Sequence, residues 1–231
     1  MMTRYTVLFL IIAVAQCSCN SFNNEVKGVD EVISYYGGNC KYSIGIAKSI
    51  NGDKDQYLEI ELSNSETLEP FIDIPDFPAS NIAYLCFNQL GTSKERYDHI
   101  KSVLIFKNGV KNTFAYSTAQ LKIVAEKMIL VERVVNLIKS GNFKDLEPML
   151  NDSAIIKYNK NILVSSIRKL ESRLGNIKGF RSIGFQFSTI GGIEILHISG
   201  IISRTKTNHQ FSIDVYPYLN DNQVLNIQYK L

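Results

Sequence analysis

Apolar positions recur at helical spacing in some stretches of this chain and alternate with polar positions in others. The longest helical stretch runs from Ser117 to Ser140. It begins with Ser117-Thr118-Ala119-Gln120, which has the form of a capping box, and Gly141 follows it as a helix stop. Its apolar stripe consists of Leu121, Val124, Met128, Val131, Val135 and Ile138. The pattern predicts one long helix that joins two halves of the chain.

Two shorter helices are predicted before this long helix. One covers residues 26–36 and ends at Gly37-Gly38, and the other covers residues 79–90. The inward-facing residues are predicted to be Val29, Val32 and Ile33 in the first helix and Ile82, Ala83, Cys86, Phe87 and Leu90 in the second.

Strand patterns alternate with these two helices. Residues 42–62 contain two alternating runs around Asn51-Gly52-Asp53, and residues 100–116 contain two more around Asn108-Gly109. Asn-Gly turns between alternating runs are typical of β-hairpins. The first half is therefore predicted as helix, hairpin, helix and hairpin, with two helices on one face of a four-stranded sheet. The repeated order suggests a duplicated unit.

The half after the long helix is predicted to contain another helix and a sheet. The helix covers residues 161–174, ends at Gly175, and turns Leu163, Ile167, Leu170 and Leu174 inward. Four alternating runs follow it, at residues 180–189, 193–204, 209–218 and 223–230. The whole chain is thus predicted to be an α+β protein whose second half ends in a four-stranded antiparallel meander.

The second half resembles a known class of domain over residues 123–231. The resemblance is carried by the order of Val131–Ser140, Gly141-Asn142-Phe143, Leu146–Met149, Leu163–Leu174, Gly179-Phe180 and Val224-Leu225-Asn226-Ile227. This order is similar to the small cystatin-like cone domains, which are related to the nuclear-transport-factor-two and polyketide-cyclase-like superfamily and occur in exported proteins. The resemblance implies a curved sheet wrapped on helices, with a pocket at the open end of the cone. It leaves function open, because such folds include both enzymes and binding domains.

The first residues have the pattern of an export signal. Arg4 supplies a positive charge, and residues 7–14 form an apolar run that is too short to span a bilayer. Two kinds of processing are consistent with the pattern. Ala13-Val14-Ala15 is a small-x-small site for signal peptidase, which would leave Gln16 at the N-terminus of a soluble periplasmic or secreted protein.

The alternative is a bacterial lipoprotein. Cys19 follows Ser18 and precedes a polar stretch like the tethers of lipid-modified proteins, and Cys17 is a second candidate for lipidation. We expect lipidation at Cys19 and anchoring to a bacterial cell envelope. The expected organisation is a signal peptide over residues 1–18, a tether over residues 19–25, an α+β domain over residues 26–120 and a cystatin-like domain over residues 121–231.

Composition narrows the class of function. The chain has 231 residues, of which 45% are hydrophobic, and a formal charge of +3 without a run of basic residues. Nucleic acid is therefore a poor candidate partner. No common nucleotide, hydrolase, redox or metalloprotease motif is present, and no His, Cys and Asp residues are spaced as a metal site. We expect no metal and no cofactor.

His197 and His209 are the catalytic candidates, because strand alternation places both on the inward side of the sheet, where acid–base chemistry would occur. Asp214 and Tyr216 have the opposite parity and are expected to be solvated. The structural alternative is that each histidine is a core or rim residue hydrogen-bonded to its neighbours. This structural role is the more common one for such residues.

Cys40 and Cys86 are candidates for a disulfide that ties the first strand to the second helix, and two free thiols are the alternative. Aromatic side chains could form a ligand platform, although their spacing is more typical of core positions: Tyr35, Tyr36, Tyr84, Phe87, Phe185 and Phe187.

Three functions are consistent with these observations. The favoured hypothesis is a non-catalytic protein of the cell envelope that binds another envelope protein or a small ligand. The second is a hydrolase or isomerase that uses a cone pocket with His197 or His209 as general base. The third is an inhibitor-like or immunity-like protein, which small size and export suggest.

Overall fold

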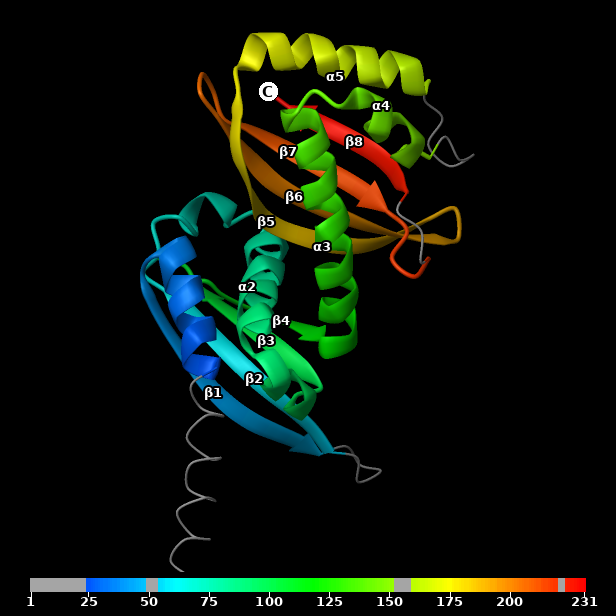
Figure 1. The fold of residues 1–231 in the computed structure, drawn as a ribbon. Coiled ribbons are helices and arrows are strands. Elements are labelled where there is room, and N and C mark those ends of the chain that lie inside the picture. The colour runs from blue at the N-terminus through cyan, green and yellow to red at the C-terminus, as the bar shows by residue number, and fades with distance from the viewer. Residues whose placement is uncertain (1–23, 49–53, 152–158, 220–222) are drawn as a thin grey trace, which may run out of the picture. The chain divides into compact units, whose positions relative to one another are not determined.

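The computed structural model describes residues 24–48, 54–151, 159–219 and 223–231. The chain is a mixed α+β protein with two four-stranded sheets (Figure 1), as its sequence predicts. Its contacts form two compact units. The first contains the described residues up to Pro75 together with Ile82–Leu121, and the second contains Asp76–Asn81 and Lys122–Leu231. The predicted signal peptide and lipidation sites lie outside the described residues.

The sheet of the first unit has the strand order β1-β2-β3-β4. The strands are β1 (Asn39–Lys48), β2 (Lys54–Ser63), β3 (His99–Ile105) and β4 (Lys111–Ser117). β1 pairs with β2 and β3 with β4 in antiparallel register, whereas β2 and β3 are parallel. The helix over residues 24–36 and helix α2 (Asp76–Gln89) are drawn on the same face of this sheet in Figure 1. Two 3₁₀ segments flank α2, namely η1 (Glu69–Phe71) and η2 (Gly91–Arg96).

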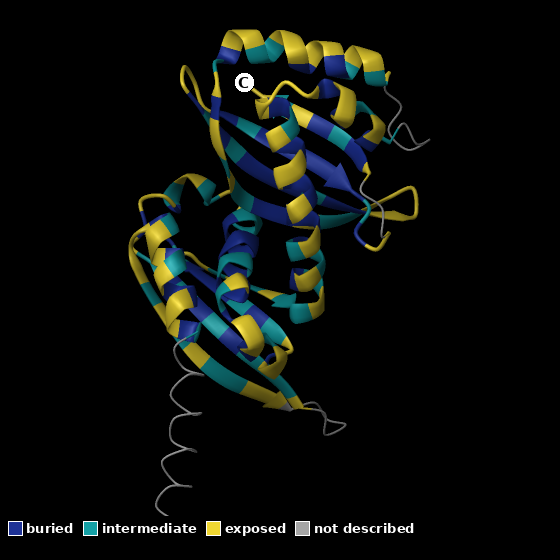
Figure 2. Ribbon diagram, viewed as in Figure 1, coloured by how far each residue is buried: buried dark blue, intermediate teal, exposed yellow. Residues whose placement is uncertain are grey.

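The core of the first unit lies between these helices and the sheet. Leu58, Ile60 and Leu62 alternate along β2 and are fully buried, and their neighbours on the same strand are half-exposed. All five apolar residues predicted to face inward from α2 are buried, namely Ile82, Ala83, Cys86, Phe87 and Leu90. Figure 2 shows this burial along α2 and the inner strands. The hydrophobic pattern therefore predicts the buried face of α2 correctly.

The first helix differs from its prediction at two points. Ile33 was expected to face inward, but it is 38% exposed. The helix packs against α2 on the side of Gly28, where a Cβ would lie only 2.7 Å from Cys86 Sγ. The buried stripe is centred on that side, and Ile33 lies outside it. The helix also includes Asn24 and Glu25, which were assigned to the tether. Glu25 is fully buried and accepts a hydrogen bond from the Tyr97 hydroxyl (2.6 Å), which holds this end of the helix in the fold.

The second unit contains an antiparallel sheet in the order β5-β6-β7-β8. Its strands are β5 (Ile177–Ile190), β6 (Ile193–Arg204), β7 (His209–Val215) and β8 (Val224–Lys230). Its helices are α3 (Thr118–Lys139, of which residues 122–139 belong to this unit), α4 (Phe143–Leu146) and α5 (Lys160–Leu174), with the 3₁₀ turn η3 (Glu147–Met149) after α4. The first six residues of α2, Asp76–Asn81, also belong to this unit, which the sequence did not predict.

Helix α3 has the boundaries that its sequence predicts. Ser117 Oγ accepts a hydrogen bond from the Gln120 amide, and Gln120 Oε1 accepts one from the Ser117 amide, both at 3.1 Å. At the other end, Gly141 has φ +68° and the Asn142 amide donates to the Leu137 carbonyl, as in a Schellman motif. The six residues of the predicted stripe, Leu121, Val124, Met128, Val131, Val135 and Ile138, are all buried.

Helix α5 buries a stripe that is shifted from the prediction. Ile167 and Leu174 are buried as expected, but Leu163 and Leu170 are half-exposed and Val164 is buried instead. Gly175, with φ +82°, ends the helix as predicted.

We predict that Ser117→Ala lowers the free energy of unfolding by about 1 kcal/mol, because the Gln120 amide loses its capping acceptor. Urea denaturation followed by circular dichroism measures this change. Ser166→Ala, at an exposed position of α5, is the matched control and should change stability by less than about 0.5 kcal/mol. Equal midpoints for wild type and Ser117→Ala would contradict the structural role of the capping box.

Candidate functional site

His209 lies within a buried network around Arg204. The Arg204 guanidinium donates from Nε to His209 Nε2 at 2.8 Å. Its Nη1 and Nη2 atoms donate to the two carboxylate oxygens of Glu171 at 2.7 and 2.5 Å. It also donates to the Gly175 carbonyl at 2.8 Å. The Arg204 side chain is fully buried, and the network connects α5 to strands β6 and β7. A buried arginine needs this degree of neutralisation, so the network is structural.

The contacts of His209 fix its protonation state. Nε2 accepts from Arg204, and Nδ1 lies 3.0 Å from the Gln210 carbonyl, to which it donates. The ring stacks on Tyr229 at a centroid distance of 4.9 Å. Burial lowers the pKa of His209, and the Arg204 charge acts in the same direction, against the Gln210 carbonyl and Glu171. Both nitrogens are occupied, so His209 has no free atom with which to act as a general base.

We predict that the neutral state of His209 makes stability depend on pH. The folded state disfavours protonation, whereas the unfolded chain protonates this side chain near pH 6.5. The stabilisation from His209 is therefore complete above about pH 6.5 and is lost as the pH falls below that value. Urea midpoints measured between pH 5 and pH 7.5 should fall toward acid in the wild type.

His209→Gln is the comparison for this measurement. It retains an acceptor for Arg204 but does not titrate, so its midpoint should fall less steeply over the same pH range. An equal slope in wild type and variant would show that other groups produce the acid sensitivity.

His197 lies in a second polar arrangement, on the opposite face of the sheet. The registers place Gln186, His197, Asp214 and Asn226 directly opposite one another on β5, β6, β7 and β8. His197 Nδ1 is 2.6 Å from Asp214 Oδ1, and Asn226 Nδ2 donates to Asp214 Oδ2 at 3.0 Å. We call these four residues the polar row. They form a continuous line of polar side chains across all four strands.

Two sequence predictions about these residues are wrong. His197 and His209 were expected on the same face, but His209 pairs with Ile202, five positions from His197 on β6, and an odd separation reverses the face. Asp214 was expected to be solvated, but it is 8% exposed. Its carboxylate is buried because His197 and Asn226 lie beside it and supply hydrogen bonds.

The start of α2 packs near the polar row within the second unit. The Phe77 ring contacts the His197 ring edge-on, at a centroid distance of 6.1 Å, and Gln186 Nε2 is 3.4 Å from Asp76 Oδ2. Ser80 Oγ accepts from the Phe185 amide of edge strand β5 at 2.8 Å. At Gly184, a Cβ would lie 2.2 Å from the Phe77 carbonyl oxygen. Glycine is therefore required for α2 to approach β5 this closely.

The polar row has part of the arrangement of an acid–base site. Asp214 orients the His197 ring and favours the tautomer with the proton on Nδ1, which leaves Nε2 as the basic atom. The His197 side chain is 25% exposed. Among the described residues, however, no hydroxyl or thiol is hydrogen-bonded to Nε2, so no nucleophile is placed beside the base. His99, the third histidine, pairs at 2.8 Å with Asp55 in the first unit.

Cys40 and Cys86 are free thiols in the structure, so the candidate disulfide is not formed there. Cys86 is fully buried, and its sulfur lies against the backbone of the first helix at Gly28. Burial raises the pKa of the Cys40 thiol to about 12 and also raises the pKa of the Cys86 thiol, to which Cys40 and then Glu25 make further contributions. Both thiols are therefore poor nucleophiles and poor metal ligands at neutral pH. No group of three His, Cys, Asp or Glu side chains in the described part of the chain could hold a metal.

The aromatic residues considered for a ligand platform are mainly packing residues. Phe87 is 2% and Phe185 3% exposed, and Phe185 contacts Phe187 edge-on at a centroid distance of 6.0 Å. Tyr35 and Tyr36 contact each other at 4.5 Å, and Tyr36 is buried. The sequence spacing therefore indicated their role in the core correctly for the buried members.

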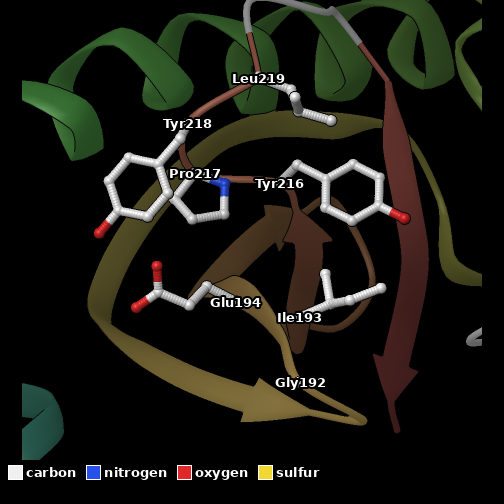
Figure 3. A pocket seen from close by; sticks show the side chains of 7 residues that line it. All are labelled: Gly192, Ile193, Glu194, Tyr216, Pro217, Tyr218 and Leu219. Carbon is white, nitrogen blue, oxygen red and sulfur yellow. The ribbon is translucent and has the colours of Figure 1, made fainter.

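A pocket lies at one end of the sheet of the second unit, where β6 begins and β7 ends. It has a volume of about 480 Å³. Figure 3 shows the residues that line it: Gly192, Ile193, Glu194, Tyr216, Pro217, Tyr218 and Leu219. Neither His197 nor His209 is among them.

The wall of this pocket is fixed from α3. Lys127 is 8% exposed, and its ammonium donates to the Leu219 carbonyl at 2.6 Å. On the opposite wall, the Gly191-Gly192 turn, with φ +58° and +81°, returns the chain into β6. The pocket is thus formed by strand ends and by a segment that one buried lysine holds through a hydrogen bond.

The pocket exposes apolar surface. Tyr218 is 60%, Leu219 51% and Ile193 39% exposed, and the adjacent Ile190 is 49% exposed. Sequence reasoning missed this site because the residues lie in turns and strand ends, where no periodic pattern applies. The available signal was the run Tyr216-Pro217-Tyr218-Leu219, which is unusually apolar for a connection between strands.

Comparisons with protein-family models, with curated proteins and with solved structures produced no match for this chain. None of the helices in the described residues has the length and apolar character needed to cross a membrane.

Proposed function

We propose that this chain is an exported, lipid-anchored and non-catalytic binding protein of a bacterial cell envelope. In this proposal the second unit is a cystatin-like cone, and the pocket between the ends of β6 and β7 binds a partner or small ligand. The observation that carries the proposal is the exposure of Tyr218, Leu219 and Ile193 together around one pocket. Clustered exposed apolar side chains mark binding sites more often than single ones do.

Three further observations support binding over catalysis. The pocket volume, about 480 Å³, lies in the range of small-molecule sites. Its lining contains one ionisable carboxylate, Glu194, and neither histidine, so acid–base partners do not converge there. His209 is fully engaged by Arg204 and Gln210. The proposed lipid anchor rests on the sequence around Cys19.

We predict that binding at the pocket can be captured in intact cells. A photo-crosslinking phenylalanine derivative at Tyr218 should give a discrete increase in the intact mass of the mature chain after irradiation. The same derivative at Ile129, which is 69% exposed on α3, is the matched control and should give none. Equal crosslinking at both positions, or none at Tyr218, would count against the pocket as a binding site.

The same mass spectra test the anchor. A diacyl or triacyl adduct on a chain that begins at Cys19, with detergent-dependent solubility, supports the lipoprotein. An unmodified chain that begins at Gln16 would contradict the anchor and indicate a soluble exported protein.

A second candidate is a hydrolase or isomerase with His197 as general base. The pairing of His197 Nδ1 with Asp214 at 2.6 Å favours it, because a carboxylate in this position orients an imidazole for proton transfer at Nε2. The His197 side chain is also partly exposed, as a residue that meets a substrate must be.

We predict, for this candidate, that His197→Ala lowers any esterase activity by about 10²- to 10⁴-fold, the usual contribution of a general base. A panel of nitrophenyl esters of increasing acyl length provides the assay. His99→Ala is the matched control, since His99 is also paired with an aspartate but lies in the first unit. Equal activity in wild type and His197→Ala would eliminate His197 as the base.

A further inference from the structure

We infer that the pocket between β6 and β7 takes a small organic cation with a methylated ammonium group. This inference rests on the proposed binding function and specifies its ligand class. It follows from the charge, the aromatic rings and the hydrogen-bonding capacity of the residues that line the pocket.

The charge of the lining is negative. Glu194 is the one charged residue among the seven that line the pocket, and its side chain is exposed. Lys127, which contacts the wall of the pocket, is buried and directs its ammonium to the Leu219 carbonyl. A ligand entering the pocket therefore contacts one carboxylate and no side-chain cation from the lining.

Two tyrosine rings line the pocket together with this carboxylate. In Figure 3 the Glu194 carboxylate lies on the same side of the pocket as the Tyr218 ring, and Ile193 lies on the side of Tyr216. The two tyrosine hydroxyls point toward opposite sides of the view, away from each other. A ring face near a carboxylate is the arrangement that attracts an organic cation, since the ring quadrupole and the charge act together.

The hydrogen-bonding capacity of the pocket selects among cations. A primary ammonium has three donors and is strongly hydrated, so it loses much solvation unless several acceptors replace water. The side chains of the lining supply one carboxylate and two tyrosine hydroxyls, which point away from each other in Figure 3, and the others are apolar: Ile193, Pro217 and Leu219. A methylated ammonium has few or no donors to satisfy and fits such a surface better.

Three probes with nearly the same skeleton separate charge, methylation and shape. Choline carries a quaternary ammonium, ethanolamine a primary ammonium, and 3,3-dimethylbutan-1-ol is the neutral isostere of choline. Backbone amide shifts of the full chain, titrated with each probe at constant ionic strength, give the three affinities. We expect choline to shift the amides of residues 192–194, 216, 218 and 219 and to bind more tightly than either other probe.

Two variants test the residues. Glu194→Gln should weaken choline binding roughly three- to tenfold, because it removes the charge but keeps the shape. Tyr218→Leu should weaken it by a similar factor, because it keeps apolar area but removes the ring face. Glu132→Gln, at an exposed position of α3, is the control for a general change in charge and should leave the affinity unchanged.

Three outcomes would overturn the inference. If the neutral isostere binds as tightly as choline and Glu194→Gln changes neither affinity, the pocket is a plain apolar site, and the proposed binding function survives. If ethanolamine binds as tightly as choline, methylation is not recognised. If choline shifts none of these amides, the ligand class is wrong, while crosslinking at position 218 decides the binding function separately.

Discussion

The second unit depends on neutralising one buried cation. The guanidinium of Arg204 has no exposed side-chain surface, and an unpaired charge there would cost several kcal/mol. Glu171 supplies the counter-charge from α5, the Gly175 carbonyl accepts at the end of that helix, and His209 accepts as a neutral ring. One requirement therefore fixes how α5 ends, how it attaches to the sheet and why His209 is unavailable for chemistry.

Polar groups on the two faces of this sheet have different roles. In the network of Arg204, each of the three guanidinium nitrogens donates to an acceptor within the unit, so none is left to bind a ligand. The polar row is open at His197, whose Nε2 has no hydrogen bond from the described residues. The Asp214 carboxylate of the row is shared between His197 and Asn226. The pocket at the strand ends differs from both, because it exposes apolar surface around a single carboxylate. Binding is therefore better supported there than catalysis is at the row.

Most of the secondary structure could be predicted from the sequence because local signals agreed with one another. The capping box at Ser117, the stripe below it and Gly141 define α3 without reference to the rest of the chain. The site could not be predicted in this way. Whether Asp214 is solvated depends on which residue lies opposite it on β6, and strand parity alone does not give the register between strands. The pocket likewise depends on two turns that are distant in sequence, and the close approach of α2 to β5 depends on Gly184.

The parallel pairing of β2 with β3 has a consequence for the order of assembly. The antiparallel pairs β1–β2 and β3–β4 each join neighbouring segments, so their contacts form after the closure of short loops. The central pair joins β2, which ends at Ser63, to β3, which begins at His99. Helix α2 lies between these two strands in the sequence. Contacts over that separation form more slowly. The two outer pairs would thus gain structure early, and the edges of β2 and β3, which end up in the middle of the sheet, would be the last to be protected from other chains.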